Sequence, residues 1–100
     1  MAQAVFYCSF QLKKGADISL FLTAAEKLNN EFISKQPGYV SWKQLQDGDS
    51  WVDLITFETM EDVKGFEENS VNAGELSLNF YAFINMNSCK VRYYTVERSY

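Results

Sequence analysis

The chain contains no histidine, and this absence limits the chemistry that its side chains can perform. Without an imidazole there is no Ser-His-Asp or Cys-His nucleophile pair, no paired-histidine metal site on a helix and no axial histidine for haem. Chemistry must therefore rest on carboxylates, Tyr, Trp, Cys, Lys or a bound molecule. The two candidate catalytic residues are Cys8 and Asp53, each of which lies within an apolar, strand-like run.

Cys8 lies between Phe6 and Phe10 on one face of a predicted strand. A nucleophilic cysteine reacts as its thiolate, and a nearby cation is a common way to lower the pKa of the thiol. The pattern places no cation on this face. Cys8 is therefore either a pocket residue or, as is usual for a buried cysteine, a small hydrophobic side chain of the core.

Asp53 interrupts an apolar run that extends from Trp51 to Phe57. Burial raises the pKa of a carboxyl group, and a carboxylate tuned in this way can act as a general base. The structural alternative is a hydrogen bond to Gln44, which the predicted hairpin places on the same face. Both interpretations stay open at this point.

The acidic residues around the hairpin partly match a calcium-binding loop. Asp47, Asp49, Asp53 and Glu58 fall at ligand positions of that template, but Val52 stands where the loop requires glycine. The segment also has the pattern of a hairpin. We therefore expect no metal site.

Aromatic residues make up 16% of the chain, and several follow strand or helix spacing. Such side chains either line a cavity for a flat aromatic ligand or, more commonly at this spacing, form the core. The candidate substrate-binding residues are Phe10, Trp42, Trp51, Phe57, Phe66, Phe80 and Phe83.

The composition is that of one globular domain spanning residues 1–100, with 47% hydrophobic and 22% charged residues. The net charge of −4, with Lys and Arg spread along the chain, argues against a nucleic-acid partner or an anionic membrane surface. No run approaches the roughly 18 apolar residues of a membrane span, and no signal-peptide pattern begins the chain. Cys8 and Cys89 form no C-x-x-C spacing, so we expect reduced thiols and a cytoplasmic location.

The first half of the chain predicts a strand, a helix and a hairpin. Period-two alternation marks the strand at 4–12, and Asp17 can cap the helix whose apolar stripe runs from Ile18 to Phe32 before Pro37-Gly38. Two further strand-like runs, 39–46 and 50–57, flank a turn sequence that favours a hairpin. With two central turn residues, one face would carry Val40, Trp42, Gln44 and Gln46 together with Trp51, Asp53, Ile55 and Phe57.

In the second half, Thr59 and Asp62 resemble a capping box at the start of a short helix. Residues 67–72 have the composition of a loop, 73–85 of an irregular helical segment, and 90–98 of the last strand. This order predicts an α+β, ferredoxin-like split βαβ fold, in which helices cover one face of a four-stranded antiparallel sheet.

The predicted sheet is apolar on both faces. Val5 and Tyr7 oppose Phe6 and Cys8, although a sheet with one face in water should alternate cleanly. A second protein surface explains this pattern, and twofold homodimers are the commonest way to supply one. We therefore expect a homodimer.

Four segments resemble the dimeric α+β barrel superfamily, particularly its antibiotic-biosynthesis-monooxygenase-like domains. They are Gln11-Leu12-Lys13-Lys14-Gly15, Gln36-Pro37-Gly38-Tyr39-Val40-Ser41, Asp47-Gly48-Asp49-Ser50-Trp51-Val52-Asp53 and Phe57-Glu58-Thr59-Met60-Glu61-Asp62. The resemblance implies two sheets packed face to face across a dimer, with a pocket between each sheet and its own helices.

The same resemblance implies a range of functions, from cofactor-independent oxygenases of polycyclic aromatics to haem-degrading enzymes. The haem-degrading members use an Asn and a Trp whose positions fall on Cys8 and Phe57, and a His that has no counterpart. We therefore expect no cofactor and a pocket for a small aromatic ligand, either in a cofactor-independent oxygenase or in a non-catalytic ligand-binding or stress-associated dimer.

Overall fold

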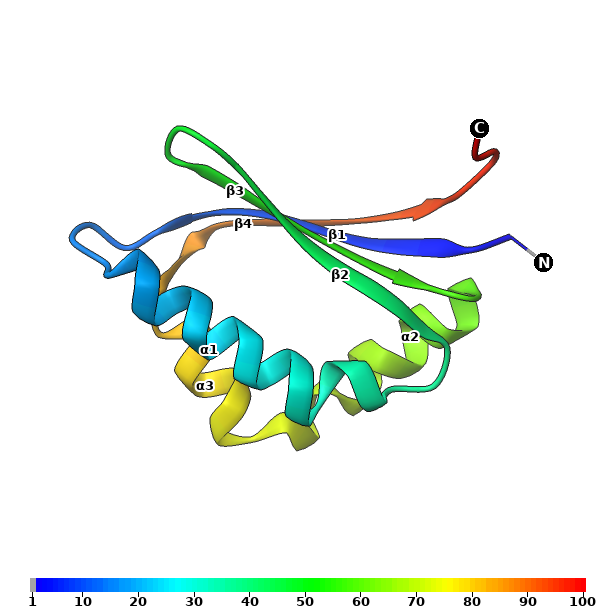
Figure 1. Cartoon of the computed structure of the whole chain (residues 1–100), viewed down its shortest axis with the longest axis horizontal. Helices are drawn as coiled ribbons and strands as arrows, with labels where there is room; N and C mark the ends of the chain where they lie inside the picture. Colours follow the sequence, from blue (N-terminus) through cyan, green and yellow to red (C-terminus); the bar gives the residue numbers. More distant parts are fainter. Residues whose placement is uncertain (1) are drawn as a thin grey trace.

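The structure is a computed structural model that describes residues 2–100. Its elements are β1 (Ala4–Leu12), α1 (Ile18–Glu31), η1 (Ile33–Lys35), β2 (Tyr39–Asp47), β3 (Ser50–Phe57), α2 (Met60–Asn69), η2 (Ser70–Ala73), α3 (Glu75–Tyr81) and β4 (Ile84–Thr95). The strands form one antiparallel sheet in the order β2-β3-β1-β4. All helices lie on one side of this sheet, which confirms the predicted fold class (Figure 1).

The core lies between the sheet and the helix layer. Even-numbered residues of β1 point toward the helices, where Ala4, Cys8 and Phe10 are buried. From α1, the buried side chains are Phe21, Ala25 and Leu28, which recur at the spacing of one helix face. The predicted alternation of β1 and the apolar stripe of the first helix are therefore confirmed.

The hairpin of β2 and β3 has the predicted two-residue turn, because Asp47 pairs with Ser50. Trp42 consequently lies opposite Ile55, and Gln44 lies opposite Asp53, on the helix side. The prediction was wrong for Val40. The register shifts between Tyr39 and Ser41, so Val40 is the extra residue of a bulge and Tyr39 pairs with Phe57 instead.

The helix starts follow the predicted capping. The carboxylate of Asp17 accepts a 3.0 Å hydrogen bond from the backbone N–H of Leu20 at the start of α1. The hydroxyl of Thr59 accepts one of 3.1 Å from the N–H of Asp62 at the start of α2. Each bond satisfies a backbone donor that the first helical turn would leave without a partner.

Three predicted boundaries were wrong. Residues 67–72 are helical rather than a loop, because α2 continues to Asn69 and η2 follows directly. The third helical segment is shorter than 73–85, since Ile84 already pairs with Leu12 and begins β4. At the other end β4 stops at Thr95, before Arg98.

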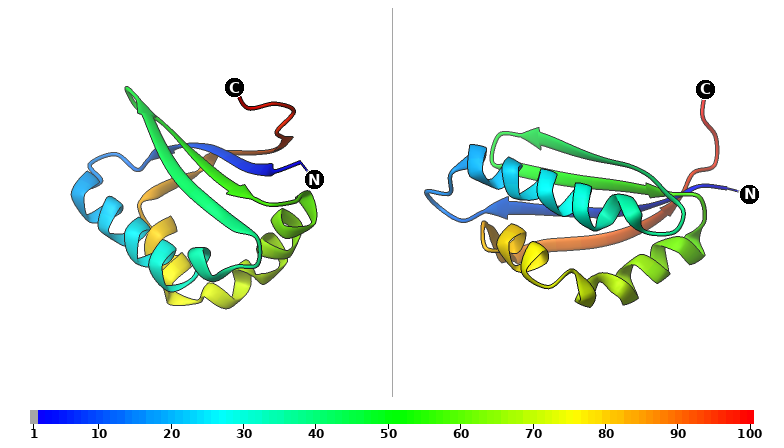
Figure 2. Two further views of the ribbon diagram at one scale, coloured as in Figure 1. Left: turned by 45° about the vertical axis from the view of Figure 1, so that its right-hand side comes forward. Right: turned by 60° about the horizontal axis from the view of Figure 1, so that its bottom comes forward.

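The other sheet face, here called the open face, has no helix over it (Figure 1). Val5, Tyr7, Val52 and Leu54 are only half-buried there, and Tyr94 is 50% exposed. The rings of Tyr7 and Tyr94 meet edge to face at 5.8 Å. The C-terminal segment rises from the sheet on this same side (Figure 2). Within residues 2–100, none of the helices has both the length and the apolar character needed to span a bilayer.

Candidate functional site

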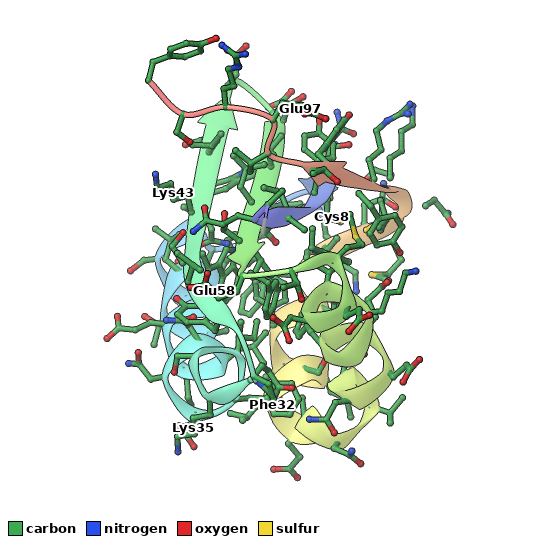
Figure 3. The ribbon with its side chains drawn as sticks, turned by 90° about the vertical axis from the view of Figure 1, so that its right-hand side faces the viewer. Cys8, Phe32, Lys35, Lys43, Glu58 and Glu97 are labelled. Atoms are coloured by element: carbon green, nitrogen blue, oxygen red, sulfur yellow. The ribbon has the colours of Figure 1, made fainter. Side chains whose placement is uncertain are left out.

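The candidate site is centred on one row of side chains that crosses the sheet under the helices. Gln44 on β2 pairs with Asp53 on β3, Asp53 pairs with Cys8 on β1, and Cys8 pairs with Val91 on β4. Side chains of paired residues in neighbouring strands point to the same face. The structure therefore brings the two predicted catalytic candidates into adjacent positions. Figure 3 labels Cys8 in the strand layer, above the helices.

Asp53 is a buried carboxylate with few partners, since only 5% of its surface is exposed. Its Oδ1 accepts a 3.2 Å hydrogen bond from Nε2 of Gln44. Burial raises the pKa of Asp53 to about 6, although Gln44 and the nearby indole of Trp42 act in the opposite direction. Asp53 is thus mainly ionised at neutral pH and is a stronger base than an exposed aspartate.

The indole of Trp42 lies beside this carboxylate, but its N–H is not aligned for a hydrogen bond to Asp53. The Nε1 atom is buried and has no hydrogen-bond partner within residues 2–100. A buried donor without a partner costs about 1 to 3 kcal/mol. Trp42 therefore offers an unused donor next to a basic carboxylate.

Cys8 is buried in the core and is not an activated nucleophile. Desolvation, followed by the influence of Cys89 and Asp53, raises the pKa of the Cys8 thiol to about 12. At neutral pH the thiol keeps its proton, so it cannot attack as a thiolate. This agrees with the packing interpretation of Cys8.

A small inner cavity lies over this row of side chains. Its volume is about 30 Å³, enough for a single water molecule but not for an aromatic ring system. Of the predicted site residues, the cavity brings together Cys8, Phe10, Trp42, Asp53, Phe66 and Phe80. The aromatic side chains themselves occupy most of the space between sheet and helices.

An outer cleft of about 200 Å³ opens between α1 and β2, on the other side of Trp42. Its walls are Leu22, Ala25, Glu26, Asn29, Trp42 and Gln44. Trp42 is thus the common wall of the outer cleft and the inner cavity. Gln44 likewise lines the cleft while it holds Asp53, so the cleft leads from solvent toward the buried carboxylate.

The remaining predicted pocket residues lie elsewhere in the core. Phe57 stacks on Phe66 with their centroids 5.2 Å apart, and Phe83 contacts Phe21. Trp51 packs against Phe21 near the start of α1. These side chains pack behind the residues that line the inner cavity and do not line it themselves.

A larger hollow, of about 510 Å³, lies away from the buried carboxylate. It is bordered by the loop after β1 and by the turn of the hairpin, including Lys13, Gly15 and Asp49. It is open to solvent, and its lining of loop, strand and helix residues includes neither Asp53 nor Cys8. We therefore base the candidate site on Asp53 rather than on this hollow.

Two site residues were missed from the sequence. Tyr81, the last residue of α3, lines the inner cavity, and burial, with smaller effects of Cys8 and Asp53, raises the pKa of its hydroxyl to about 12. Asn29 contributes a buried Oδ1 that has no hydrogen-bond partner within residues 2–100. The polar position of Asn29 on an otherwise apolar helix face was a usable signal, whereas the direction of Tyr81 depends on where α3 ends.

Comparison with family models found no match, and comparison with curated proteins found none either. Solved structures do match. SnoaB from Streptomyces nogalater, a cofactor-independent oxygenase, superimposes with a TM-score of 0.78 at 13% sequence identity, over 99% of this chain and 97% of SnoaB. A protein from Nitrosomonas europaea, provisionally described as an antibiotic biosynthesis monooxygenase, gives 0.73 at 15% identity, over 95% of this chain and 90% of that one.

A third match is a conserved protein from Methanosarcina mazei, with a TM-score of 0.72 at 12% identity, over 94% of this chain and 92% of that one. The matched structures thus include a described oxygenase and a conserved protein described without a reaction. They confirm, for the fold, the resemblance to antibiotic-biosynthesis-monooxygenase-like α+β barrel proteins. At these identities the likeness defines the fold and leaves the reaction to the site.

Proposed function

We propose that this chain binds a small, electron-rich aromatic compound between α1 and the sheet and oxidises it with O2 without a resident cofactor. The observation that carries the proposal is the buried Asp53 carboxylate, whose pKa is raised to about 6 by burial. The fold of SnoaB, a cofactor-independent oxygenase, supports the same class of reaction.

The proposed route of entry is the outer cleft. Because Trp42 separates this cleft from the inner cavity, a rotation of its side chain would join the two spaces. A flat ring could then occupy the volume that the indole leaves, against Phe80 and Leu28. The substrate hydroxyl would then reach the carboxylate of Asp53, which lines the inner cavity.

In the proposed reaction, Asp53 removes the proton of a ring hydroxyl and so makes the ring electron-rich enough to reduce O2. One oxygen atom replaces a ring hydrogen as a carbonyl, and the other leaves as water. A phenol with the formula HO–Ar–H and one O2 thus give a quinone, O=Ar=O, and one water. The apolar walls of the cavity exclude solvent from the reactive anion.

The test is oxygen uptake by the purified protein with hydroxylated naphthalene and anthracene substrates. We expect the rate to rise with pH through about 6, as Asp53 loses its proton. Asp53→Asn should lower the rate about 100-fold and remove this pH dependence, because a general base contributes a factor of this order. The control Asp49→Asn, in the exposed hairpin turn, should keep the wild-type rate. Equal rates for wild type and Asp53→Asn would exclude Asp53 as the base.

The second candidate is a non-catalytic ligand-binding protein that holds the compound in the outer cleft of about 200 Å³ and does not admit it to the inner cavity. The inner cavity, at about 30 Å³, is too small for the compound, because aromatic side chains fill most of the space around it. Quenching of Trp fluorescence by the same compounds without oxygen uptake would support binding alone. If neither quenching nor uptake occurred, both candidate functions would be wrong.

We further propose that the protein acts as a homodimer through the open face, in the cytoplasm where its thiols stay reduced. The support is the exposed apolar surface of that face, including Leu45 and Tyr94. The strand register also places three cations on the open face, Lys43, Lys90 and Arg92. The partner must therefore provide hydrogen-bond acceptors for these side chains, or they must lie at the solvated rim of the interface.

A further inference from the structure

Two cysteines that are far apart in the sequence meet on neighbouring strands. Cys8 on β1 pairs with Val91, and Cys89 lies two residues from Val91 along β4. In an antiparallel pair, residues two positions apart share a face and are diagonal neighbours of the paired residue. The register, together with the packing of Cys89 against the core, places both thiols on the helix side of the sheet.

The backbone around Cys89 is not part of the regular ladder. Between the pairs Ser9–Lys90 and Gln11–Asn85, the four residues 86–89 of β4 stand against Phe10 alone. Ser88 closes this bulge, since its Oγ accepts a 2.8 Å hydrogen bond from the N–H of Gln11 and donates one of 2.6 Å to the carbonyl of Asn85. Cys89 is the last residue of the bulge, next to Lys90.

The Cys8 and Cys89 side chains lie close enough that each affects the pKa of the other. Cys8 is buried, whereas Cys89 is partly exposed and packs at the margin of the core on an edge strand. A small oxidant can thus reach Cys89, and Cys8 is the only other thiol of the chain.

We propose that Cys8 and Cys89 form a reversible intramolecular disulfide when the protein meets a peroxide oxidant. A disulfide usually requires Cα atoms within about 7 Å of each other, and diagonal cross-strand neighbours lie at roughly 7 to 8 Å. The bulge supplies the remaining adjustment, because residues 86–89 are not bound by the ladder to β1. The inference does not depend on the proposed aromatic substrate.

The chemistry is balanced with hydrogen peroxide as the oxidant. The Cys89 sulfur attacks one peroxide oxygen, the O–O bond breaks, and hydroxide leaves with the Cys89 proton as water. The Cys8 sulfur then attacks the Cys89 sulfenic acid, an S–S bond forms, the S–O bond breaks, and a second water carries away the Cys8 proton. Two thiols and one peroxide thus give one disulfide and two waters.

Both thiols resist ionisation, so the reaction should be slow compared with that of dedicated peroxide sensors. Burial raises the pKa of Cys8 to about 12, and it also raises that of Cys89. Since the thiolate is the reacting species, the pair should oxidise under sustained rather than brief exposure.

The experiment treats the folded protein with hydrogen peroxide, blocks free thiols after denaturation and identifies the products by intact mass and peptide mapping. We expect the loss of both thiols, a mass lower by two hydrogens, and a linked peptide pair that contains Cys8 and Cys89. Dithiothreitol should restore both thiols. Peptide mapping of the wild type needs no variant, so the result does not depend on whether a substituted chain folds.

Two variants separate the roles of the thiols. Cys8→Ser should leave Cys89 as a sulfenic acid that dimedone traps, because the resolving thiol is absent. Cys89→Ser should leave Cys8 unmodified, because it is buried. A wild type in which Cys89 becomes sulfinic acid or links two chains while Cys8 stays free would overturn the proposal.

Discussion

Gln44 and Asp53 are joined across β2 and β3 by a hydrogen bond of 3.2 Å, and this is the single aligned donor that the Asp53 carboxylate receives from a side chain within residues 2–100. A carboxylate commonly accepts several hydrogen bonds when it is buried and charged. Asp53 is therefore held in its ionised form at a cost in stability, and this cost leads to the first prediction.

Asp53→Asn should stabilise the fold at neutral pH. The pKa of Asp53 rises from 3.8 to about 6 on folding, so the folded state binds the proton more tightly than the unfolded state. Stability should therefore fall as pH rises from about 4 to about 6, and it stays lower above that range. The amide carries no charge, can still accept from Gln44, and should recover up to about 3 kcal/mol at pH 7.

Urea unfolding of wild type and Asp53→Asn at several pH values between 4 and 8 measures this effect. The exposed control Glu58→Gln should follow the wild type. A variant Asp53→Asn that is less stable than wild type at pH 7 would contradict this prediction, because it would mean that the ionised carboxylate stabilises the fold.

Phe21→Ala should be among the most destabilising single substitutions. Phe21 is fully buried, and its ring contacts Phe10, Trp51, Phe80 and Phe83 at centroid distances of 5.2 to 6.0 Å. Removal of a buried phenyl ring typically costs about 3 to 5 kcal/mol. Chemical denaturation should report this loss, whereas Leu78→Ala, on the exposed side of α3, should change the free energy of unfolding little.

Gly38→Ala should destabilise the protein much more than Gly15→Ala. Both glycines have a φ of 78°, where an L-residue costs roughly 1 to 2 kcal/mol. A methyl group at Gly15 meets open space, but one at Gly38 would overlap the carboxyl group of Asp62.

Thermal unfolding of the two variants separates the backbone cost from the steric cost. The double variant Gly38→Ala with Asp62→Ala should recover only part of the difference, because the carboxyl group is then gone but the Cβ of residue 62 stays 2.8 Å from the added methyl group. Equal melting temperatures for the two single variants would show that the contact between Gly38 and Asp62 is not tight.

Leu54→Arg should convert the proposed homodimer into a monomer. Leu54 is half-buried on the open face, and a further cation next to Lys43, in the row that also holds Arg92 two strands away, would add repulsion and a desolvation cost at the interface. Light scattering at micromolar concentration should report twice the chain mass for wild type and one chain mass for the variant. Leu78→Arg, on the helix layer, is the matched control, and a monomeric wild type would refute the dimer.

The sequence predicted those parts of the fold that local patterns determine. The alternation of β1, the cap of α1 by Asp17 and the two-residue hairpin turn all follow from neighbouring residues. The start of β4 was not predicted, because Asn85, Asn87 and Ser88 lack the apolar alternation of a strand. Asn85 pairs with Gln11 because the bulge at 86–89 takes up the extra residues of β4, and this bulge is a tertiary feature.

For the candidate site, the sequence identified Asp53 and the option of a bond to Gln44, because the hairpin register fixes which residues share a face. It did not reveal how small the inner cavity is. That volume depends on how the rings of Phe66, Phe80 and Trp42 pack between elements that are distant in the chain. The proximity of Cys8 and Cys89 on neighbouring strands was hidden for the same reason.

The two irregular strands also affect how copies of the chain meet one another in crowded solution. β2 and β4 are the outer strands, and each contains a bulge, at Val40 in β2 and at 86–89 in β4. An incoming strand needs an evenly spaced row of backbone donors and acceptors, which bulges disrupt. The sheet is therefore protected against edge-to-edge polymerisation, and growth into fibrils is opposed even though the chain is rich in apolar, strand-forming residues.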